Sequence, residues 1–297
     1  MPAVTPLMVK ELREKTGAGM LDCKKALEAT NGSIDAAIDW LREKGISKAA
    51  KKADRIAAEG LCSIKTEGNK TAILEVNSET DFAAKSAPFG ALVAKLTDFV
   101  IASDVTSAEA ALALNTEEGT VETVLQAATG QIGEKLTLRR CEVINKNDSE
   151  SFGTYIHMGG IIGVLVVVEG NGDLSNVAKD VAMHVAAINP QYIKREDVSQ
   201  EFIDNETHIQ LEAAKNDPKL AGKPEKILEG IINGKVNKTL AEICLVEQPF
   251  VKDPSVSVGN FAKANGATIV KVVRYGVGEG IQKREENFAE EVAKQMK

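Results

Sequence analysis

The same order of elements, a strand, a tight turn, a second strand, a loop and a helix, is predicted twice along this chain. In the first copy, residues 61–65 and 71–76 have the pattern of strands, and Glu67-Gly68-Asn69 between them favours a hairpin turn. Residues 88–103 then predict a helix. A helix that follows a hairpin can cover one face of its sheet, so this order favours an α+β fold.

The second copy lies further along the chain. Residues 153–158 predict a short strand, Gly159-Gly160 a turn, and residues 161–169 a strand apolar enough to be buried on both faces. A loop and a helix over residues 175–187 complete the copy. The repetition predicts a core of two related α+β subdomains side by side.

The N-terminal segment predicts three short helices on tight turns. Thr5-Pro6 favours a helix start, because the hydroxyl can cap the helix and proline fits its first position. Residues 20–30 and 34–43 predict two more helices, and Asn31-Gly32 between them favours a left-handed stop. A module this small has a thin core, so we expect it to serve as an interaction module.

A basic stretch follows at residues 42–55, where six Lys and Arg stand against Glu43 and Asp54. Its composition predicts a solvated helix that joins the small module to the rest of the chain. One interpretation is a patch for nucleic acid. The alternative is a charged face that meets an acidic protein partner or only water.

Further elements surround the two copies. Residues 107–130 predict a helical segment, and residues 136–143 and 268–275 predict strands. Two apolar-striped helices at residues 196–216 and 225–236 flank a Pro/Gly turn and predict an antiparallel helical hairpin. Such an arm has little core of its own, so we expect its apolar stripe to lie against a second copy or a partner.

These elements divide the chain into five predicted parts. They are an N-terminal module with its basic linker (1–55), a first core subdomain (56–145), a second core subdomain (146–195 and 237–275), the helical hairpin (196–236) and a C-terminal module (276–297) that ends in a helix at residues 287–297.

Composition excludes several kinds of function. The net charge is −7 and only 4% of the residues are aromatic, whereas broad nucleic-acid binding needs basic surface and stacking rings. The four cysteines lie far apart, which argues against a zinc ribbon, a cluster site or a disulfide framework and predicts packing roles: Cys23, Cys62, Cys141 and Cys244. We find no signal peptide or apolar span and expect a cytoplasmic protein without membrane contact.

Motifs for catalysis are also missing from the sequence. It contains no phosphate-binding loop, dinucleotide fingerprint, nucleophile elbow or zinc-protease motif. Of the three histidines, His184 falls on an apolar helix and predicts a hydrogen-bonded core or interface residue, and His208 is expected in solvent. His157, at the end of a predicted strand, remains a candidate. We expect no catalytic residue, no metal site and no cofactor.

The segment Glu79-Thr80-Asp81-Phe82 stands out, because a bulky ring lies beside a carboxylate directly after a buried strand. One interpretation is structural: Thr80 or Asp81 caps the next turn and Phe82 packs under it. The functional interpretation is a wedge that projects from the end of the sheet into a partner.

Several stretches together resemble one family. They are KELREKTGAGMLDCKKALEATNGSIDAAIDWLREKG, KAAKKADRIAAEG, ILEVNSETDFAAK, DPSVSVG and GVGEGI. In this order and spacing the chain resembles the elongation factor Ts family, the guanine-nucleotide exchange factors of elongation factor Tu. The resemblance runs over nearly the whole chain.

The resemblance implies an N-terminal module similar to ubiquitin-associated domains, two α+β subdomains, a helical hairpin and a C-terminal helical module. It also implies that Thr80, Asp81, Phe82 and Ala83 enter elongation factor Tu near its bound magnesium and disturb metal and phosphate binding. Further partner contacts are implied at Leu12, Met20, Lys24, Lys52, Ile132, Gly133 and His157. A homodimer through the hairpin is a further expectation.

Two positions depart from the family pattern. Ala83 stands where the family usually has valine, which removes about 1–2 kcal/mol of apolar contact if the site is fully buried. Around His157 the sequence reads YIHMGGIIG, where the family has a shorter H-x-x-[RK]-I-G, so the basic residue is missing. We therefore expect this hairpin tip to contact its partner differently.

Two other classes of function are weighed against exchange. An adaptor would bind a protein through the helical module without opening a nucleotide site. An enzyme acting on a small molecule would need a convergent acid/base set, which the sequence does not show.

Overall fold

The computed structural model describes residues 4–16, 18, 20–50, 52–217, 220 and 223–282. The chain divides into two compact units, each treated by itself below. The first contains Met1–Asn145, Met158–Ile162 and the described residues from Tyr275 onward, and the second contains Lys146–His157 and Gly163–Arg274. Among the described residues, no helix is both long and apolar enough to cross a membrane. The predicted helix at residues 287–297 lies outside the described residues.

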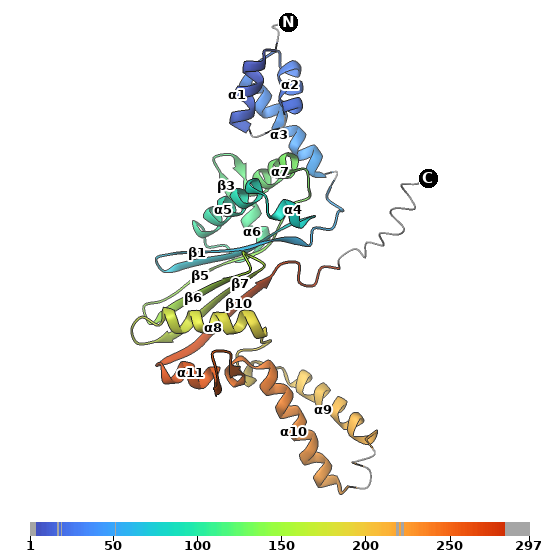
Figure 1. The fold of residues 1–297 in the computed structure, drawn as a ribbon, viewed down its shortest axis with the longest axis vertical. Helices are drawn as coiled ribbons and strands as arrows, with labels where there is room; N and C mark the ends of the chain where they lie inside the picture. The colour runs from blue at the N-terminus through green and yellow to red at the C-terminus, as the bar shows by residue number, and fades with distance from the viewer. Residues whose placement is uncertain are drawn as a thin grey trace. The chain divides into compact units, whose positions relative to one another are not determined.

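Three helices open the first unit, as predicted: α1 (Pro6–Thr16), α2 (Met20–Ala29) and α3 (Ile34–Ala50) (Figure 1). The Thr5 hydroxyl accepts a hydrogen bond from the Met8 amide, and Asn31 and Gly32 have positive φ after α2, which confirms both turn signals. The helices share a small core of buried side chains: Leu12, Cys23, Ala26, Leu27 and Ala37.

The basic stretch is helical as predicted as far as Ala50, but the expectation that it is solvated is wrong at Gly45, which is buried. Helix α3 continues through it to Ala50 and packs against α7 (Val121–Ile132). The two helices approach closely at Gly45 and Gly130, where a Cβ on Gly130 would lie 2.9 Å from the Gly45 Cα. Arg42 hydrogen-bonds the carbonyl oxygen of Glu118. The stretch is therefore partly packed against α7 rather than fully solvated.

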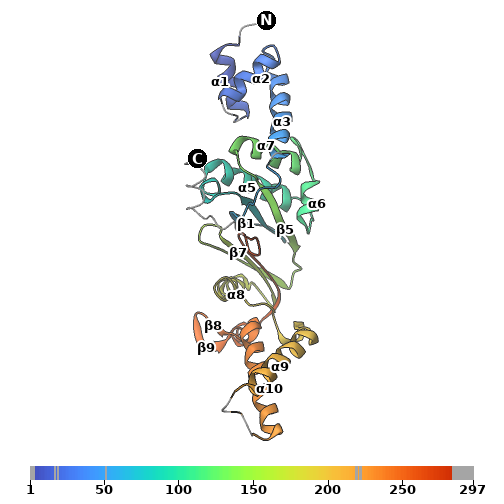
Figure 2. The same ribbon diagram turned by 90° about the vertical axis from the view of Figure 1, so that its right-hand side faces the viewer.

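A three-stranded antiparallel sheet forms the centre of the first unit, with β2 (Lys70–Ser78) between β1 (Glu59–Glu67) and β5 (Thr137–Asn145). The predicted hairpin turn is confirmed, because Glu67 pairs with Lys70 across it. Helices α5 (Ala87–Ile101) and α7 lie on one face of this sheet in Figures 1 and 2, and their apolar residues share its core.

The segment predicted as one helix over residues 107–130 is broken, so that prediction is wrong in its middle. It contains α6 (Ala108–Leu112), the short strands β3 (Asn115–Thr116) and β4 (Gly119–Thr120), and then α7. Gly119 has φ of 104°, which a helix does not allow, and the Thr120 hydroxyl caps α7 by accepting from the Thr123 amide.

Glu75, on the central strand β2, is a fully buried carboxylate. It accepts hydrogen bonds from Arg140 Nε at 2.5 Å, Arg139 at 3.1 Å, Asn77 at 3.0 Å and the Gly278 amide at 2.8 Å. Burial alone raises the pKa of Glu75, but the hydrogen bonds from Gly278, Asn77 and Arg140 outweigh it, so the pKa lies below its ordinary value of 4.5.

The second unit contains a sheet in the order β10-β7-β6, made of β6 (Glu150–His157), β7 (Ile162–Gly170) and β10 (Ala267–Gly276). Helix α8 (Ser175–Ile188) packs against β6. The contact is close at Gly153, where a Cβ would meet the Ala178 backbone at 2.0 Å. The second strand–turn–strand–helix copy is thus present as elements, at bounds close to those predicted.

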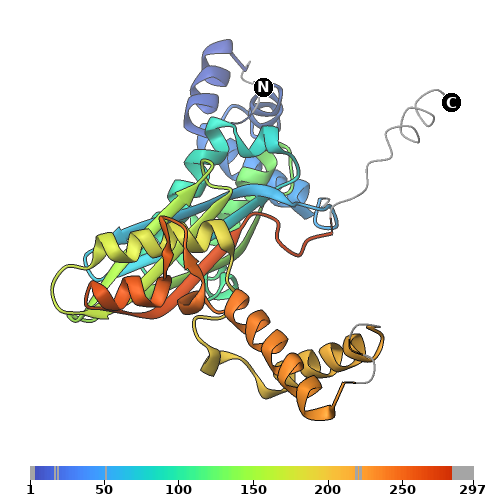
Figure 3. The same ribbon diagram turned by 60° about the horizontal axis from the view of Figure 1, so that its bottom comes forward.

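Two long helices of the second unit, α9 (Gln200–Lys215) and α10 (Glu225–Ile243), lie side by side in Figures 1 and 3. The predicted end of the second helix at residue 236 is wrong, because Val236 and Leu240 continue its buried stripe to Ile243. At the base of these helices, Arg195 in η1 (Arg195–Asp197) pairs with Glu247 in η2 (Leu245–Glu247).

The remaining elements of this unit are β8 (Pro249–Phe250), β9 (Asp253–Ser257) and α11 (Val258–Ala264).

The buried carboxylate gives a stability prediction. Its folded-state pKa is depressed, so its stabilisation is complete above the unfolded-state pKa near 4.5 and is lost as the pH falls through the lower folded-state value. We expect Glu75→Gln to lower the free energy of unfolding by about 3 kcal/mol at pH 7, because it removes the buried negative charge with which Arg139 and Arg140 pair. Urea denaturation measures this, and the variant's loss of stability between pH 5 and pH 3 should be smaller than that of the parent.

The matched control is Glu67→Gln on β1, whose carboxylate is exposed and pairs with Lys65. We expect this change to cost less than about 0.5 kcal/mol. Equal destabilisation by the two substitutions would contradict the role given to Glu75.

Candidate functional site

The predicted wedge sits on α4 (Asp81–Ala84), a four-residue helix that follows β2 directly. Thr80 has extended backbone, and its hydroxyl accepts a hydrogen bond from the Ala83 amide at 3.2 Å. This is the geometry of a helix N-cap, which supplies a partner for an otherwise free amide. The structural interpretation of Thr80 as a cap is therefore confirmed.

The ring of Phe82 projects outward, so the expectation that it packs under the turn is wrong. Phe82 is 83% exposed, whereas Ala83 and Ala84 beside it are buried against the unit's own core. One side of α4, with the buried alanines, packs at the end of the sheet, and the side with Phe82 faces outward. Ala83, at 8% exposure, offers a partner only a small area.

Asp81 lies beside this ring and is exposed. Its carboxylate pairs with Lys85 Nζ at 2.7 Å, one helical turn further on. The hydrogen bond from the Lys85 ammonium lowers the pKa of the Asp81 carboxyl below its ordinary value, so the group is ionised at neutral pH. The exposed end of α4 therefore presents an apolar ring and a negative charge side by side.

Residues 79–80 and 134–135 hold each other through reciprocal hydrogen bonds. The Glu134 carboxylate accepts from the Thr80 hydroxyl at 2.6 Å and from the Thr80 amide at 3.0 Å. In return, Glu79 Oε1 accepts from the Lys135 amide at 2.6 Å, and its carboxylate also pairs with Arg55 at 3.2 Å. We call these four residues, Glu79, Thr80, Glu134 and Lys135, the clasp. It joins the end of β2 to the residues that follow α7.

Three other predicted partner residues lie around the clasp. Gly133 ends α7 in a left-handed conformation with φ of 86°, and its carbonyl oxygen accepts a hydrogen bond from Lys52 Nζ. Ile132, the last residue of α7, is half-buried. The structure thus brings Lys52 onto Gly133, which directly precedes Glu134 of the clasp, although 81 positions separate Lys52 from Gly133.

The predicted partner residues of the N-terminal module are placed differently from one another. Met20 is 61% exposed and Lys24 is exposed and pairs with Glu28 on the same helix. Leu12 is fully buried in the module core, so its side chain has no surface to offer a partner. Two leucines of this module, Leu7 and Leu21, are each 74% exposed.

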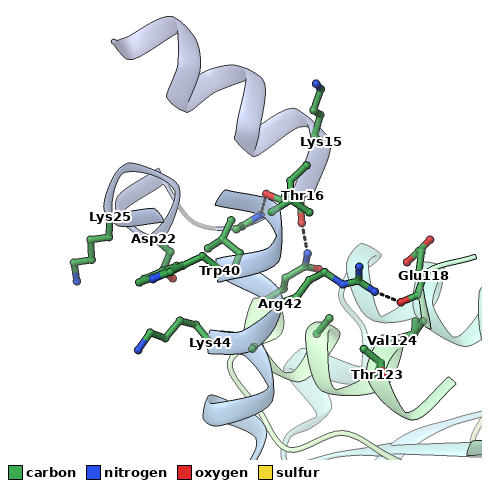
Figure 4. A pocket seen from close by; sticks show the side chains of 17 residues that line it. Lys15, Thr16, Asp22, Lys25, Trp40, Arg42, Lys44, Glu118, Thr123 and Val124 are labelled. Carbon is green, nitrogen blue, oxygen red and sulfur yellow. Dashed lines mark hydrogen bonds between the residues drawn. The ribbon is translucent and has the colours of Figure 1, made fainter. Parts of the chain in front are cut away.

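A cavity of about 550 Å³ lies where the N-terminal helices meet α7. Figure 4 shows Arg42 extending from α3 to Glu118 at its edge, while Trp40 and Lys44 line it from the same helix. The lining carries both signs of charge, and the Arg42 hydrogen bond to Glu118 lies at its edge. We therefore assign the cavity to the joint between the module and α7.

In the second unit, His157 ends β6 and is half-buried. Its Nδ1 lies 3.2 Å from the Tyr155 hydroxyl. His184 is a core residue as predicted: it is fully buried and hydrogen-bonds Gln248 and the Val251 amide, and burial lowers its pKa. His208 on α9 is exposed, also as predicted.

The four cysteines are all free and buried, which confirms their packing role. Burial raises the pKa of the Cys141 thiol to about 11, so this thiol is protonated at neutral pH. In the described part of the chain, no group of three or more His, Cys, Asp or Glu side chains could hold a metal ion.

The described geometry at the end of the first sheet is thus an exposed ring beside an ionised carboxylate. Comparison with known protein families identifies the family to which this chain belongs. The family model described as elongation factor Ts matches residues 79–279, which is more than half of the chain and begins at the clasp. The chain belongs to the elongation factor Ts family and is a nucleotide exchange factor for elongation factor Tu in translation elongation, not an enzyme.

The exposure of Phe82 predicts that folding does not depend on it. We expect Phe82→Ala to change the free energy of unfolding by less than about 0.5 kcal/mol. The control, Phe89→Ala on the adjacent helix α5, removes a ring that is 0% exposed and should cost about 3–5 kcal/mol. Urea denaturation of both variants measures this difference. A large loss of stability in Phe82→Ala would show that the ring packs in solution.

Proposed function

We propose that Asp81 and Phe82 enter elongation factor Tu near its bound magnesium and weaken its hold on the metal and the GDP phosphates. The observation that carries this proposal is the 83% exposure of Phe82 on a helix whose other side is buried, directly beside an ionised carboxylate. Aromatic side chains are enriched at protein interfaces, so an exposed ring beside an ionised carboxylate suits a surface that another protein covers.

The chemistry of the partner's site explains why these two side chains suit the task. Mg²⁺ demands near-ideal octahedral geometry and keeps several waters when it binds a nucleotide. A carboxylate brought near that shell competes for its water network. A phenyl ring inserted behind it shifts the supporting element, because a packed core has discrete arrangements rather than continuous ones.

Energetics require more than these two side chains. The exchange factor and the nucleotide weaken each other's binding by the same coupling free energy. Each tenfold loss of affinity corresponds to about 1.4 kcal/mol. A large acceleration needs several times that amount, so a broad docking surface must contribute. We assign this docking to Met20, Lys24, Lys52, Ile132, Gly133 and His157, and give Leu12 the indirect role of packing the N-terminal module.

Release of fluorescent GDP from elongation factor Tu tests the wedge. We expect Phe82→Ala to lower the maximal release rate by at least tenfold, because the lost ring contributes more than about 1.4 kcal/mol when it is buried in the partner. Phe82→Leu keeps an apolar side chain, so its release rate should lie between those of the parent and Phe82→Ala. The matched control is Ile188→Ala, which removes an exposed apolar side chain from α8 in the second unit.

An unchanged rate for Asp81→Ala with Phe82→Ala would contradict the wedge. If the parent protein also failed to speed release at substoichiometric amounts, the adaptor alternative would hold instead.

We also propose that α9 and α10 pair with a second copy of the chain. This proposal is supported by exposed isoleucines on these two helices, Ile209 at 49% and Ile227 at 50%. Two helices with a thin shared core gain stability when such side chains are covered.

Light scattering measures the mass in solution. A homodimer has twice the chain mass of 31.7 kDa. We expect the double substitution Ile209→Glu with Ile227→Glu to lower the measured mass to that of one chain, because charges at a buried interface are costly. The control, Asn233→Glu, adds charge at an exposed polar position of α10 and should leave the dimer intact. A parent protein of single-chain mass would contradict the proposal.

The finer organisation completes the proposed function. We propose that the three N-terminal helices form a module similar to ubiquitin-associated domains and that the two sheets belong to related subdomains. The five predicted parts, at 1–55, 56–145, 146–195 with 237–275, 196–236 and 276–297, would then act as separate docking bodies, with the hairpin extended to Ile243 by α10. The protein would work in the cytoplasm without direct contact to nucleic acid or a membrane.

A further inference from the structure

The helix that carries Asp81 and Phe82 is too short to be stable by itself. An isolated helix gains stability only over several turns, whereas α4 has four residues. Its position must therefore come from its anchors. One anchor is the pair of buried alanines, and the other is the cap at Thr80.

The cap at Thr80 is incomplete within its own segment. In a capping box, the N-cap hydroxyl accepts from the amide of the third helical residue, and a Glu or Gln at that residue accepts from the N-cap amide. Here the third residue is Ala83, which has no acceptor in its side chain. Glu134, from beyond the end of α7, accepts the Thr80 amide at 3.0 Å in its place.

Glu134 also sets the direction of the Thr80 hydroxyl. A hydroxyl has one proton and two lone pairs. Because the proton goes to Glu134 Oε1 at 2.6 Å, a lone pair is free to accept the Ala83 amide.

We infer that Glu134 is a positioning residue for nucleotide exchange: it completes the cap of α4 from another part of the chain and so presents Asp81 and Phe82 in a fixed orientation. This inference rests on the proposed role of those two side chains. The reciprocal bond from the Lys135 amide to Glu79 keeps Glu134 in place, since it fixes the backbone on the other side of the clasp.

The first experiment tests the clasp in the free protein. Hydrogen exchange followed by NMR reports how often the Thr80 and Ala83 amides open. We expect Glu134→Ala to speed exchange at both amides by about tenfold, and Glu134→Gln to have a smaller effect because its amide oxygen still accepts one bond. The matched control is Glu122→Gln, the same change at an exposed position of α7, whose carboxylate bonds only Gln126 among the described hydrogen bonds.

The second experiment tests the consequence for exchange. Glu134→Ala should lower the maximal rate of GDP release about tenfold while the half-saturating concentration of the factor changes less than twofold, because orientation is lost and the docking surfaces remain. Glu134→Gln should retain an intermediate rate, and Glu122→Gln should equal the parent. A residue that only stabilised the fold would change both parameters together.

The outcomes separate this inference from the proposed function. The positioning role of Glu134 would be overturned by unchanged protection of the Thr80 amide in Glu134→Ala. It would also be overturned by lost protection with an unchanged maximal rate of GDP release, even if Phe82→Ala slows GDP release. If Phe82→Ala leaves the rate of GDP release unchanged, the proposed function fails, while hydrogen exchange at the amides still reports on the clasp.

Discussion

The hydrogen bonds of the clasp are the constraint on which the candidate site depends. Two consecutive residues after β2 and two consecutive residues after α7 each supply a carboxylate to the other pair's backbone amide. Neither segment has regular structure of its own at this point, so each is fixed by the other. Charged acceptors on backbone amides are among the stronger hydrogen bonds, and here they hold a helix that has little cooperativity.

The sheet beneath the clasp supplies rigidity. Strand β2 is buried along nearly its whole length, and Glu75 ties it to β5 through Arg139 and Arg140. Arg140 also lies over the Tyr275 ring at 4.3 Å, and the Gly278 amide reaches the same carboxylate, so the residues after β10 are held on this sheet. A strand fixed at its centre by a buried charge transmits little movement to its end. In the proposed mechanism, Phe82 is presented to elongation factor Tu from a helix anchored on this buried strand.

Local signals predicted much of this fold. The Glu67-Gly68-Asn69 turn, the Asn31-Gly32 stop and the Thr5-Pro6 start each depend on a few adjacent residues, and each is present in the structure. The cap at Thr80 was also readable, because a hydroxyl before a short helix has a defined role. For Phe82 the sequence left two interpretations open, packing under the turn or projecting outward, because an aromatic ring is apolar in either place, and the 83% exposure agrees with the second.

Features that depend on contacts distant in sequence could not be predicted. Glu134 bonds a residue 54 positions away, and nothing in its neighbours marks it as a cap. The continuation of α3 depends on the close approach of Gly45 to Gly130, and the break at Gly119 depends on a positive φ that sequence alone leaves optional. The Leu12 side chain was expected at a partner surface, but an apolar helix position serves a core equally well.

The dependence of GDP release on magnesium is the sharpest test of the proposed wedge. In the proposed mechanism, Asp81 acts on the metal's surroundings in elongation factor Tu. The rate of catalysed GDP release is measured for the parent and for Asp81→Ala, at millimolar Mg²⁺ and again with the metal removed by chelation. We expect Asp81→Ala to slow release about tenfold with magnesium and hardly at all without it, since the metal is then already gone. An equal defect under both conditions would contradict it.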